Sequence, residues 1–164
     1  MLKLSHLSTM SVEEFTRVVG PVFDHSPWIA ERTWSTRPWT SLEQLHAELS
    51  GIIQSARQEE QLALIRAHPD LVGRAVLTTE SRGEQAAAKL ADLTPDEINA
   101  FEAFNATYRE RFGFPFVICA RLNKKEAILR AFPERLAHSR EKEIATALTE
   151  IGKIAKLRLR DIVK

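Results

Sequence analysis

A histidine at the end of a predicted helix is the first feature of this sequence that could carry out chemistry. His68 is followed directly by Pro69 and Asp70. Because proline disfavours the α region for the residue before it, His68 should lie extended where the helix stops. The unperturbed pKa of histidine is near neutral pH, so a histidine on such a corner suits proton transfer, and Asp70 could orient its ring. The same three residues can also mark only a helix end, and both interpretations stay open at this point.

Glu84 is a second candidate with two interpretations. Ser81 and Glu84 have the Ser-x-x-Glu spacing of a capping box, in which both side chains satisfy backbone N–H groups at a helix start. A glutamate in that role would be ionised and purely structural. However, a helix start also offers free N–H groups and the positive end of the helix dipole, which suit an anionic ligand. Ser81, Glu84 and Gln85 could therefore line a site as well as begin a helix.

Arg158 lies on the apolar face of the long helix predicted over residues 139–163. At roughly 100° per residue, it falls within about 40° of the centre of that face, whereas Arg160 points away. Its stem could let the guanidinium reach water. Otherwise the charge needs an anion, from another side chain or from a substrate carboxylate. If the substrate supplies it, we expect Arg158 to be partly hydrated in an open pocket. The apolar face is made of Ile144, Leu148, Ile151, Ala155 and Ile162.

The aromatic segment that begins at Phe112 is irregular, because Gly113 and Pro115 break the helical spacing. It is either an aromatic plug between helices or a means of turning the backbone of residues 116–120 toward a pocket, with Arg121 at its rim. Cys119 lies in the longest purely apolar run and is predicted to be a buried hydrophobic residue. No metal site is predicted, because no ligand spacing is formed by the other histidines, His6, His25, His46 and His138.

Helix signals account for most of the chain, and no alternating strand pattern exceeds a few residues. We therefore predict an all-α fold, a single-domain helical bundle of about seven to nine helices over residues 1–164. Asn105 should be a hydrogen-bonded core amide. The predicted elements are helices that start after Ser11, near Pro27 and after Ser41, a helix over 58–67, a loop over 76–80, a helix from Ser81 to near Asp92, one from Thr94, one capped by Asn123 and interrupted by Pro133, and the helix over 139–163.

The composition is that of an ordinary globular protein, with 44% hydrophobic and 27% charged residues in 164. The 23 Lys and Arg residues nearly cancel the 22 Asp and Glu residues, so no global field favours nucleic acid or an anionic membrane. A single cysteine excludes an intramolecular disulfide and a thiolate metal cluster. The first residues lack the apolar run of a signal peptide, and no stretch is long enough to span a membrane. We expect a cytoplasmic protein without membrane or nucleic-acid partners.

These residues together resemble the OHCU decarboxylases, which act on 2-oxo-4-hydroxy-4-carboxy-5-ureidoimidazoline (OHCU) in uric acid degradation. The resemblance covers nearly the whole chain in the same order. The blocks that carry it are His68-Pro69-Asp70-Leu71 at the end of residues 64–71, Glu80-Ser81-x-x-Glu84-Gln85, Phe112-Gly113-Phe114-Pro115-Phe116 at the end of residues 105–116, and residues 151–159 with Arg158. It implies an all-helical carboxy-lyase, usually a homodimer, that releases CO2 to give (S)-allantoin without a cofactor.

The resemblance also implies roles for individual residues. His68 corresponds to the family's proton-transfer histidine, and Glu84 and Arg158 to its catalytic glutamate and arginine. One departure is His138, where many members have asparagine after the Arg-Leu pair, so substrate recognition is not assigned to it. The positions that correspond to substrate contacts are Pro69, Ser81, Gln85 and the backbone of Phe116, Val117, Ile118, Cys119 and Ala120.

Two other functions are compatible with the residues themselves. A helical interaction module, with a purely structural His68 corner, should expose a sizeable apolar patch and lack a convergent histidine, glutamate and arginine. A hydrolase of a related ureide would use His68 to activate water instead. Stereospecific release of CO2 distinguishes the decarboxylase from that hydrolase.

Overall fold

The computed structural model describes residues 1–73, 78–90 and 92–164, and within these ranges the regular structure is helical. The β pairing found there is an isolated bridge between Leu2 and Val163. The prediction of an all-α fold is therefore confirmed. Backbone contacts divide the chain into two compact units, which we call unit 1 (residues 1–67 and 152–164) and unit 2 (residues 68–151). That residues 1–164 form a single domain stays a prediction.

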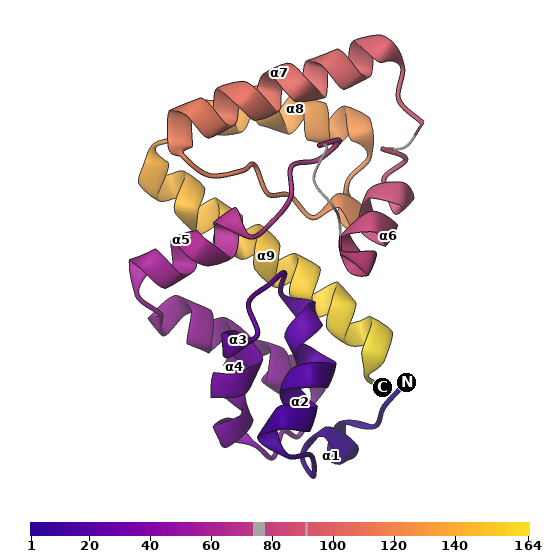
Figure 1. Ribbon diagram of the computed structural model, residues 1–164, viewed down its shortest axis with the longest axis vertical. Helices are drawn as coiled ribbons and strands as arrows, with labels where there is room; N and C mark the ends of the chain where they lie inside the picture. Colours follow the sequence, from indigo (N-terminus) through magenta and orange to yellow (C-terminus); the bar gives the residue numbers. More distant parts are fainter. Residues whose placement is uncertain (74–77, 91) are drawn as a thin grey trace. The chain divides into compact units, whose positions relative to one another are not determined.

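Unit 1 contains the five N-terminal α-helices and the C-terminal part of the last one (Figure 1). Its helix starts follow the sequence signals, since Ser11 forms a complete capping box with Glu14 and the Ser41 hydroxyl accepts from the Gln44 N–H. The chain ends lie together, because the Leu2 N–H donates to the Ile162 carbonyl at 2.8 Å. The elements are α1 (Leu4–Leu7), α2 (Val12–Val19), η1 (Gly20–Val22), α3 (Trp28–Thr33), η2 (Trp34–Thr36), α4 (Leu42–Ser55), α5 (Gln58–Arg66) and the end of α9 (Arg140–Ile162).

Unit 2 contains α6 (Thr79–Ala87), α7 (Pro95–Phe112), η3 (Ala120–Leu122), α8 (Lys125–Leu136) and the start of α9. Helices α7 and α8 lie side by side (Figure 1). Between them the Phe132 ring stacks on Phe116, with ring centroids 3.9 Å apart, and on Phe104 at 5.1 Å. Gly113 ends α7 in the left-handed conformation, with φ of 79°, which favours glycine. The irregular segment after it is therefore fixed against an aromatic core.

A buried carboxylate joins three elements of unit 2. Glu143 on α9 is fully buried, and its Oε1 accepts from the Tyr108 hydroxyl at 2.5 Å and from Arg135 Nε at 2.7 Å. Its Oε2 lies 2.9 Å from His138 Nδ1. Burial, with the hydrogen bond to Glu143 second, raises the pKa of the Tyr108 phenol. The charge is thus surrounded by donors from α7, α8 and the turn before α9.

The start of α6 differs from the prediction. Ser81 does not cap the helix, because the cap is Thr78, whose hydroxyl accepts from the Ser81 N–H. Glu84 therefore lies inside α6 and not in its first turn. Of the loop predicted over 76–80, residues 76 and 77 lie outside the described residues, and Thr79 and Glu80 are helical. The helix predicted to end near Asp92 ends at Ala87.

The two predictions for α8 were wrong. The N-cap is Lys124, without a side-chain cap, and Asn123 Nδ2 instead donates to the Cys119 carbonyl at 2.9 Å. Pro133 does not interrupt the helix, which continues to Leu136. An internal proline removes one helical hydrogen bond. The buried side chains of Phe132 and Arg135 on either side favour the helix enough to offset that loss.

The Glu143 contacts predict the effect of removing the Tyr108 hydroxyl. Tyr108→Phe keeps the ring packing but deletes one donor to a buried charge, so the free energy of unfolding should fall by about 1.5–3 kcal/mol. Urea denaturation of the two proteins measures the difference. Thr107→Ala, which loses an exposed hydroxyl bonded to the Ala103 carbonyl of the same helix, is the control and should change stability by less than about 0.5 kcal/mol. Equal stability of Tyr108→Phe and wild type would contradict the conclusion that the Tyr108 hydroxyl compensates the buried Glu143 charge.

Candidate active site

His68 lies where the sequence predicts it, just beyond the end of a helix. Helix α5 ends at Arg66 with Ala67 as its C-cap, and His68 and Pro69 follow in non-helical conformations. The His68 side chain is buried, with 6% of the residue exposed. The sequence suggested that Asp70 could orient the histidine ring. In the structure, Asp70 Oδ1 accepts a hydrogen bond from Arg109 Nη2 at 2.9 Å. The prediction that His68 lies in a non-helical position just after a helix is confirmed.

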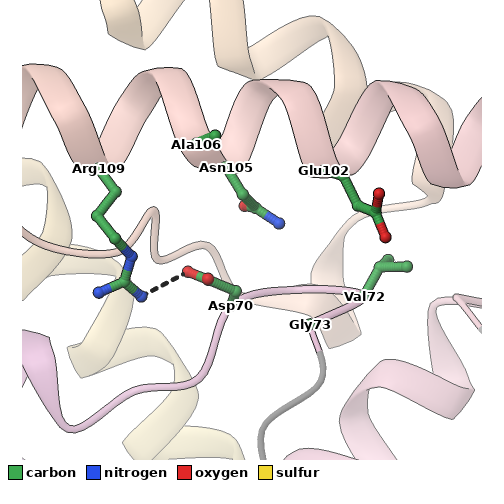
Figure 2. Close-up of a pocket in the computed structure, with 7 residues that line it drawn as sticks. All are labelled: Asp70, Val72, Gly73, Glu102, Asn105, Ala106 and Arg109. Atoms are coloured by element: carbon green, nitrogen blue, oxygen red, sulfur yellow. Dashed lines mark hydrogen bonds and ion pairs between the residues drawn. The ribbon is translucent and has the colours of Figure 1, made fainter.

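The four residues after Pro69 form a tight turn, which we call the Asp70–Gly73 turn. The Gly73 N–H donates to the Asp70 carbonyl at 3.3 Å, and Val72 has a positive φ of 60°. A Cβ on residue 73 would lie 3.0 Å from the Asp70 Cβ, which explains the glycine there. The turn and one face of α7 line a pocket of about 340 Å³ (Figure 2). The turn contributes Asp70, Val72 and Gly73 to the lining of this pocket, and α7 contributes residues that include Asn105 and Arg109.

Glu84 is part of the buried face of α6 and not a helix cap. It is 9% exposed, and Ser81, one turn earlier, is 6% exposed. Helix α6 packs against η3, the short helix that follows residues 116–119. The Glu84 carboxylate is close enough to Cys119 to act on its thiol electrostatically. The structure therefore brings Glu84 and the segment 116–120 together within unit 2.

The segment 116–120 is buried and held through its backbone. Arg135 Nη1 donates to the Val117 carbonyl at 2.5 Å, and the Cys119 N–H donates to Glu150 Oε1 at 3.2 Å. Burial raises the pKa of the Cys119 thiol, and the carboxylates of Glu150 and Glu84 add to the increase. Cys119 is 1% exposed, which confirms it as a buried hydrophobic residue. These contacts fix the segment, and they use backbone groups of Val117 and Cys119 that the resemblance assigns to substrate.

Gln85, predicted to bind substrate, also has a structural contact. Its Oε1 accepts from the Val72 N–H at 3.2 Å and so links α6 to the Asp70–Gly73 turn. Asn105 is the core amide predicted from the sequence, since it is buried and its Nδ2 donates to the Leu71 carbonyl at 2.7 Å. Two helices thus hold the turn next to His68.

Arg158, in unit 1, has a different environment from the one expected. It is only 4% exposed, and its Nη1 donates to Asp24 Oδ1 at 2.8 Å and to the Val22 carbonyl at 3.2 Å. The expectation of a partly hydrated guanidinium in an open pocket was wrong, because a buried carboxylate of the same unit compensates the charge. The orientation on α9 was correct, since Arg158 is buried and Arg160 exposed.

Sequence reasoning missed the carboxylates that hold these groups. Glu143 and Glu150 belong to a second row on α9, in which they alternate with the buried Ala147 and Ile154. That spacing of four and three residues was a usable signal. Asp24 lies 134 residues from Arg158, and no local pattern connects the two.

In the described ranges, no group of three or more His, Cys, Asp or Glu side chains could hold a metal ion, and no helix is both long and apolar enough to cross a membrane.

Comparison with known proteins gives consistent results. A sequence model described as OHCU decarboxylase matches residues 8–160. The chain is 42% identical to the 2-oxo-4-hydroxy-4-carboxy-5-ureidoimidazoline decarboxylase of Halalkalicoccus jeotgali, over 98% of this chain and 92% of that protein. It is 41% identical to the decarboxylase of the same name from Amia calva, over 99% and 95%. A crystal structure of (S)-allantoin synthase superimposes with a TM-score of 0.81 and 26% identity, over 100% of this chain and 54% of that one.

The fold and the buried histidine and glutamate define an all-α protein with acid–base groups inside one of its units. More specifically, the chain belongs to the OHCU decarboxylase family, as the match over residues 8–160 and the identities above 40% show.

The buried pair in unit 1 predicts how Arg158 variants behave. Arg158→Met leaves the Asp24 carboxylate buried without its main partner, so the free energy of unfolding should fall by about 3–5 kcal/mol. Adding Asp24→Leu to Arg158→Met removes that uncompensated charge and should recover most of the loss. Urea denaturation of the single and double variants checks this. Arg160→Met, on the exposed side of α9, is the control; a double variant no more stable than Arg158→Met would contradict the prediction.

Proposed function

We propose that this protein catalyses the cofactor-independent decarboxylation of OHCU to (S)-allantoin in uric acid degradation. The single observation that carries the proposal is membership of the OHCU decarboxylase family over residues 8–160. The curated relatives that match along nearly their whole length are named for this reaction. The protein is thus a carboxy-lyase whose substrate is a small ureidoimidazoline.

The chemistry explains why side chains alone can suffice. The carboxylate of OHCU is attached to a ring carbon next to a C=N bond. When the C–C bond to the carboxylate breaks, its electron pair passes into that C=N bond, and CO2 leaves. This leaves an enol, and the nitrogen that receives the C=N electrons takes up a proton. The neighbouring ring carbon, which carries the ureido group, is then protonated, while the hydroxyl group loses its proton and becomes the carbonyl of allantoin. The ring serves as the electron sink, so the protein must orient the carboxylate, stabilise developing charge and protonate one face.

His68 and Glu84 are the groups that we assign to proton transfer. Both are buried side chains of unit 2, and each lies on a separately supported element, the corner after α5 and the interior of α6. Exclusion from water strengthens their interactions with a bound polar substrate. In this proposal they bind the hydroxyl group and ring nitrogens of the substrate and control the delivery of the proton.

The substrate contacts follow the resemblance to the family. Pro69 directly follows His68 in the sequence, Ser81 lies three residues before Glu84, and Gln85 directly follows Glu84. The Gln85 oxygen accepts from Val72, which leaves its amide N–H groups as the substrate contacts that we propose. The segment Phe116 to Ala120 would present backbone groups, with Val117 and Cys119 held as described above.

Arg158 is the third residue proposed for catalysis, and its role rests on the resemblance. Its guanidinium donates through Nη1 to Asp24 Oδ1 and to the Val22 carbonyl. We propose that Arg158 also holds an anionic oxygen of the substrate, with Asp24 fixing the orientation of the guanidinium. A homodimer, which the resemblance implies, and a cytoplasmic location, which the sequence composition and the lack of a signal-peptide pattern favour, are further parts of the proposal. Light scattering of the purified protein tests the former.

The reaction itself is tested with freshly made substrate. Urate is converted by urate oxidase and hydroxyisourate hydrolase, and circular dichroism then follows the appearance of optically active allantoin with and without this protein. Faster formation of the (S) form supports the proposal. A rate and an optical purity equal to the spontaneous reaction would reject it, and ring opening without CO2 release would point to the ureide hydrolase.

His68→Gln should fold like the wild type and lose at least about 100-fold in kcat, because it removes a proton-transfer group from a corner that proline creates. The allantoin assay and a thermal melt measure the two properties. His6→Gln, at an exposed position in unit 1, is the matched control and should retain full activity. Near wild-type turnover of His68→Gln would make His68 a structural residue.

Glu84→Gln keeps the size of the side chain but removes its charge and its ability to accept a proton. We expect a folded protein with kcat lowered at least about 100-fold. Glu80→Gln, one turn earlier on the exposed side of α6, is the control and should behave as wild type. If Glu84→Gln stays fully active in the same assay, the glutamate has no part in the chemistry.

A further inference from the structure

The turn that follows His68 is held at three consecutive residues by two helices of unit 2. From α7, Arg109 Nη2 donates to Asp70 Oδ1 at 2.9 Å and Asn105 Nδ2 donates to the Leu71 carbonyl at 2.7 Å. From α6, Gln85 Oε1 accepts from the Val72 N–H at 3.2 Å. Figure 2 shows Arg109 and Asn105 on the side of α7 that faces this turn, with the Asp70–Arg109 contact drawn.

We propose that Arg109 and Asn105 are positioning residues for His68. The inference rests on the proposed function, in which His68 transfers the proton. The mechanical link is Pro69, whose ring fixes its φ angle and restricts the backbone of the residue before it. Because Asp70 and Leu71 are held by α7, the backbone of His68 has little freedom to move. A proton-transfer group needs this, since a displacement of about 1 Å can cost 100-fold in rate.

The Asp70–Arg109 contact is poorly suited to stabilising the fold. The Arg109 side chain is 50% exposed and that of Asp70 27% exposed. Exposed ion pairs contribute little to stability, because water screens them and two side chains lose freedom. The pair nevertheless joins residues that are 39 positions apart, and it connects α7 to the residue two positions after His68. Its main effect is therefore on the geometry of the turn.

Asn105 supports the same conclusion from a buried position. The residue is 8% exposed, and its Oδ1 has no hydrogen-bond partner among the described residues. An unsatisfied buried acceptor is unfavourable, so an apolar side chain would avoid a cost that the amide incurs. What the amide adds in return is the bond from Nδ2 to the Leu71 carbonyl. Its contribution is thus to hold the turn.

The contact between Gln85 and Val72 also connects the turn to the helix that carries Glu84. Gln85 directly follows Glu84, the other residue proposed for proton transfer, and it holds Val72 in the same turn. The turn therefore lies between the helix that carries Glu84 and the helix that carries Arg109 and Asn105. Anchoring the turn also limits movement of His68 relative to Glu84.

The first experiment compares Arg109→Met with Arg109→Lys in the allantoin assay. Arg109→Met should lower kcat by about tenfold with KM and melting temperature nearly unchanged, because the turn loosens while the core stays intact. Arg109→Lys should recover most of the rate, since Asp70 receives a single hydrogen bond that an ammonium group can also donate. Lys125→Met is the matched control, as it breaks the Lys125–Glu97 ion pair, which joins α8 to α7 away from the turn. It should leave kcat unchanged.

The second experiment needs no activity. The NMR signals of the histidine rings, assigned with His68→Gln, should shift or broaden for His68 in Arg109→Met and in Asn105→Leu. The signals of His46, which bonds to the Gly152 carbonyl in unit 1, should not move. Unchanged His68 signals together with unchanged kcat in Arg109→Met would overturn the positioning role. If Arg109→Met fails to fold, Asp70→Asn weakens the same contact from the other side and decides the question by the same criteria.

The two experiments separate this inference from the proposed function. If the wild type does not accelerate formation of (S)-allantoin, the proposed function fails, and the His68 signals alone show whether α7 holds the turn. If the wild type is active but Arg109→Met and Asn105→Leu retain its kcat and its His68 signals, only the positioning role fails.

Discussion

The burial of the Glu143 carboxylate is the constraint on which the organisation of unit 2 depends. A carboxylate with no exposed surface is strongly unfavourable unless donors surround it. Tyr108 from α7 and Arg135 from α8 donate to it, and His138 lies against its second oxygen. Arg135 then donates to the Val117 carbonyl and lies over the Phe116 ring. The irregular segment 116–120 is thus held in place by the groups that compensate the buried charge.

Around His68 the proline creates the corner, and other residues hold it in place. Pro69 ends the helical run and makes the chain turn, but a proline alone does not determine where the turn lies. That position comes from donors and acceptors on α6 and α7, which contact Asp70, Leu71 and Val72. The proposed catalytic residues of unit 2 are therefore placed mainly by neighbours that need not touch the substrate.

Local signals in the sequence predicted several helix starts correctly, and at α6 they failed because two cap signals compete. The caps at Ser11, Ser41 and Thr94 were correct because each hydroxyl is followed three residues later by Glu or Gln and then by an apolar run. At α6, Thr78 and Ser81 are both acceptable caps, and the structure uses Thr78. The ambiguity matters, because the choice of Thr78 moves Glu84 from an exposed first turn to a buried position. Helical periodicity correctly turned Arg158 toward the interior, yet it could not identify Asp24 as its partner.

The Asp24–Arg158 pair also bears on how a decarboxylase can use an arginine. A lone buried guanidinium would bind the substrate carboxylate strongly, and that affinity would be lost when the carboxylate leaves as neutral CO2. Catalysis depends on binding the transition state more tightly than the substrate, so strong binding of the departing charge would raise the barrier. If Arg158 contacts the substrate as proposed, its pairing with Asp24 partly neutralises the guanidinium in advance and so reduces this ground-state attraction. Under the proposed function, the guanidinium would then orient an anionic oxygen through its N–H groups, and its net charge would contribute less.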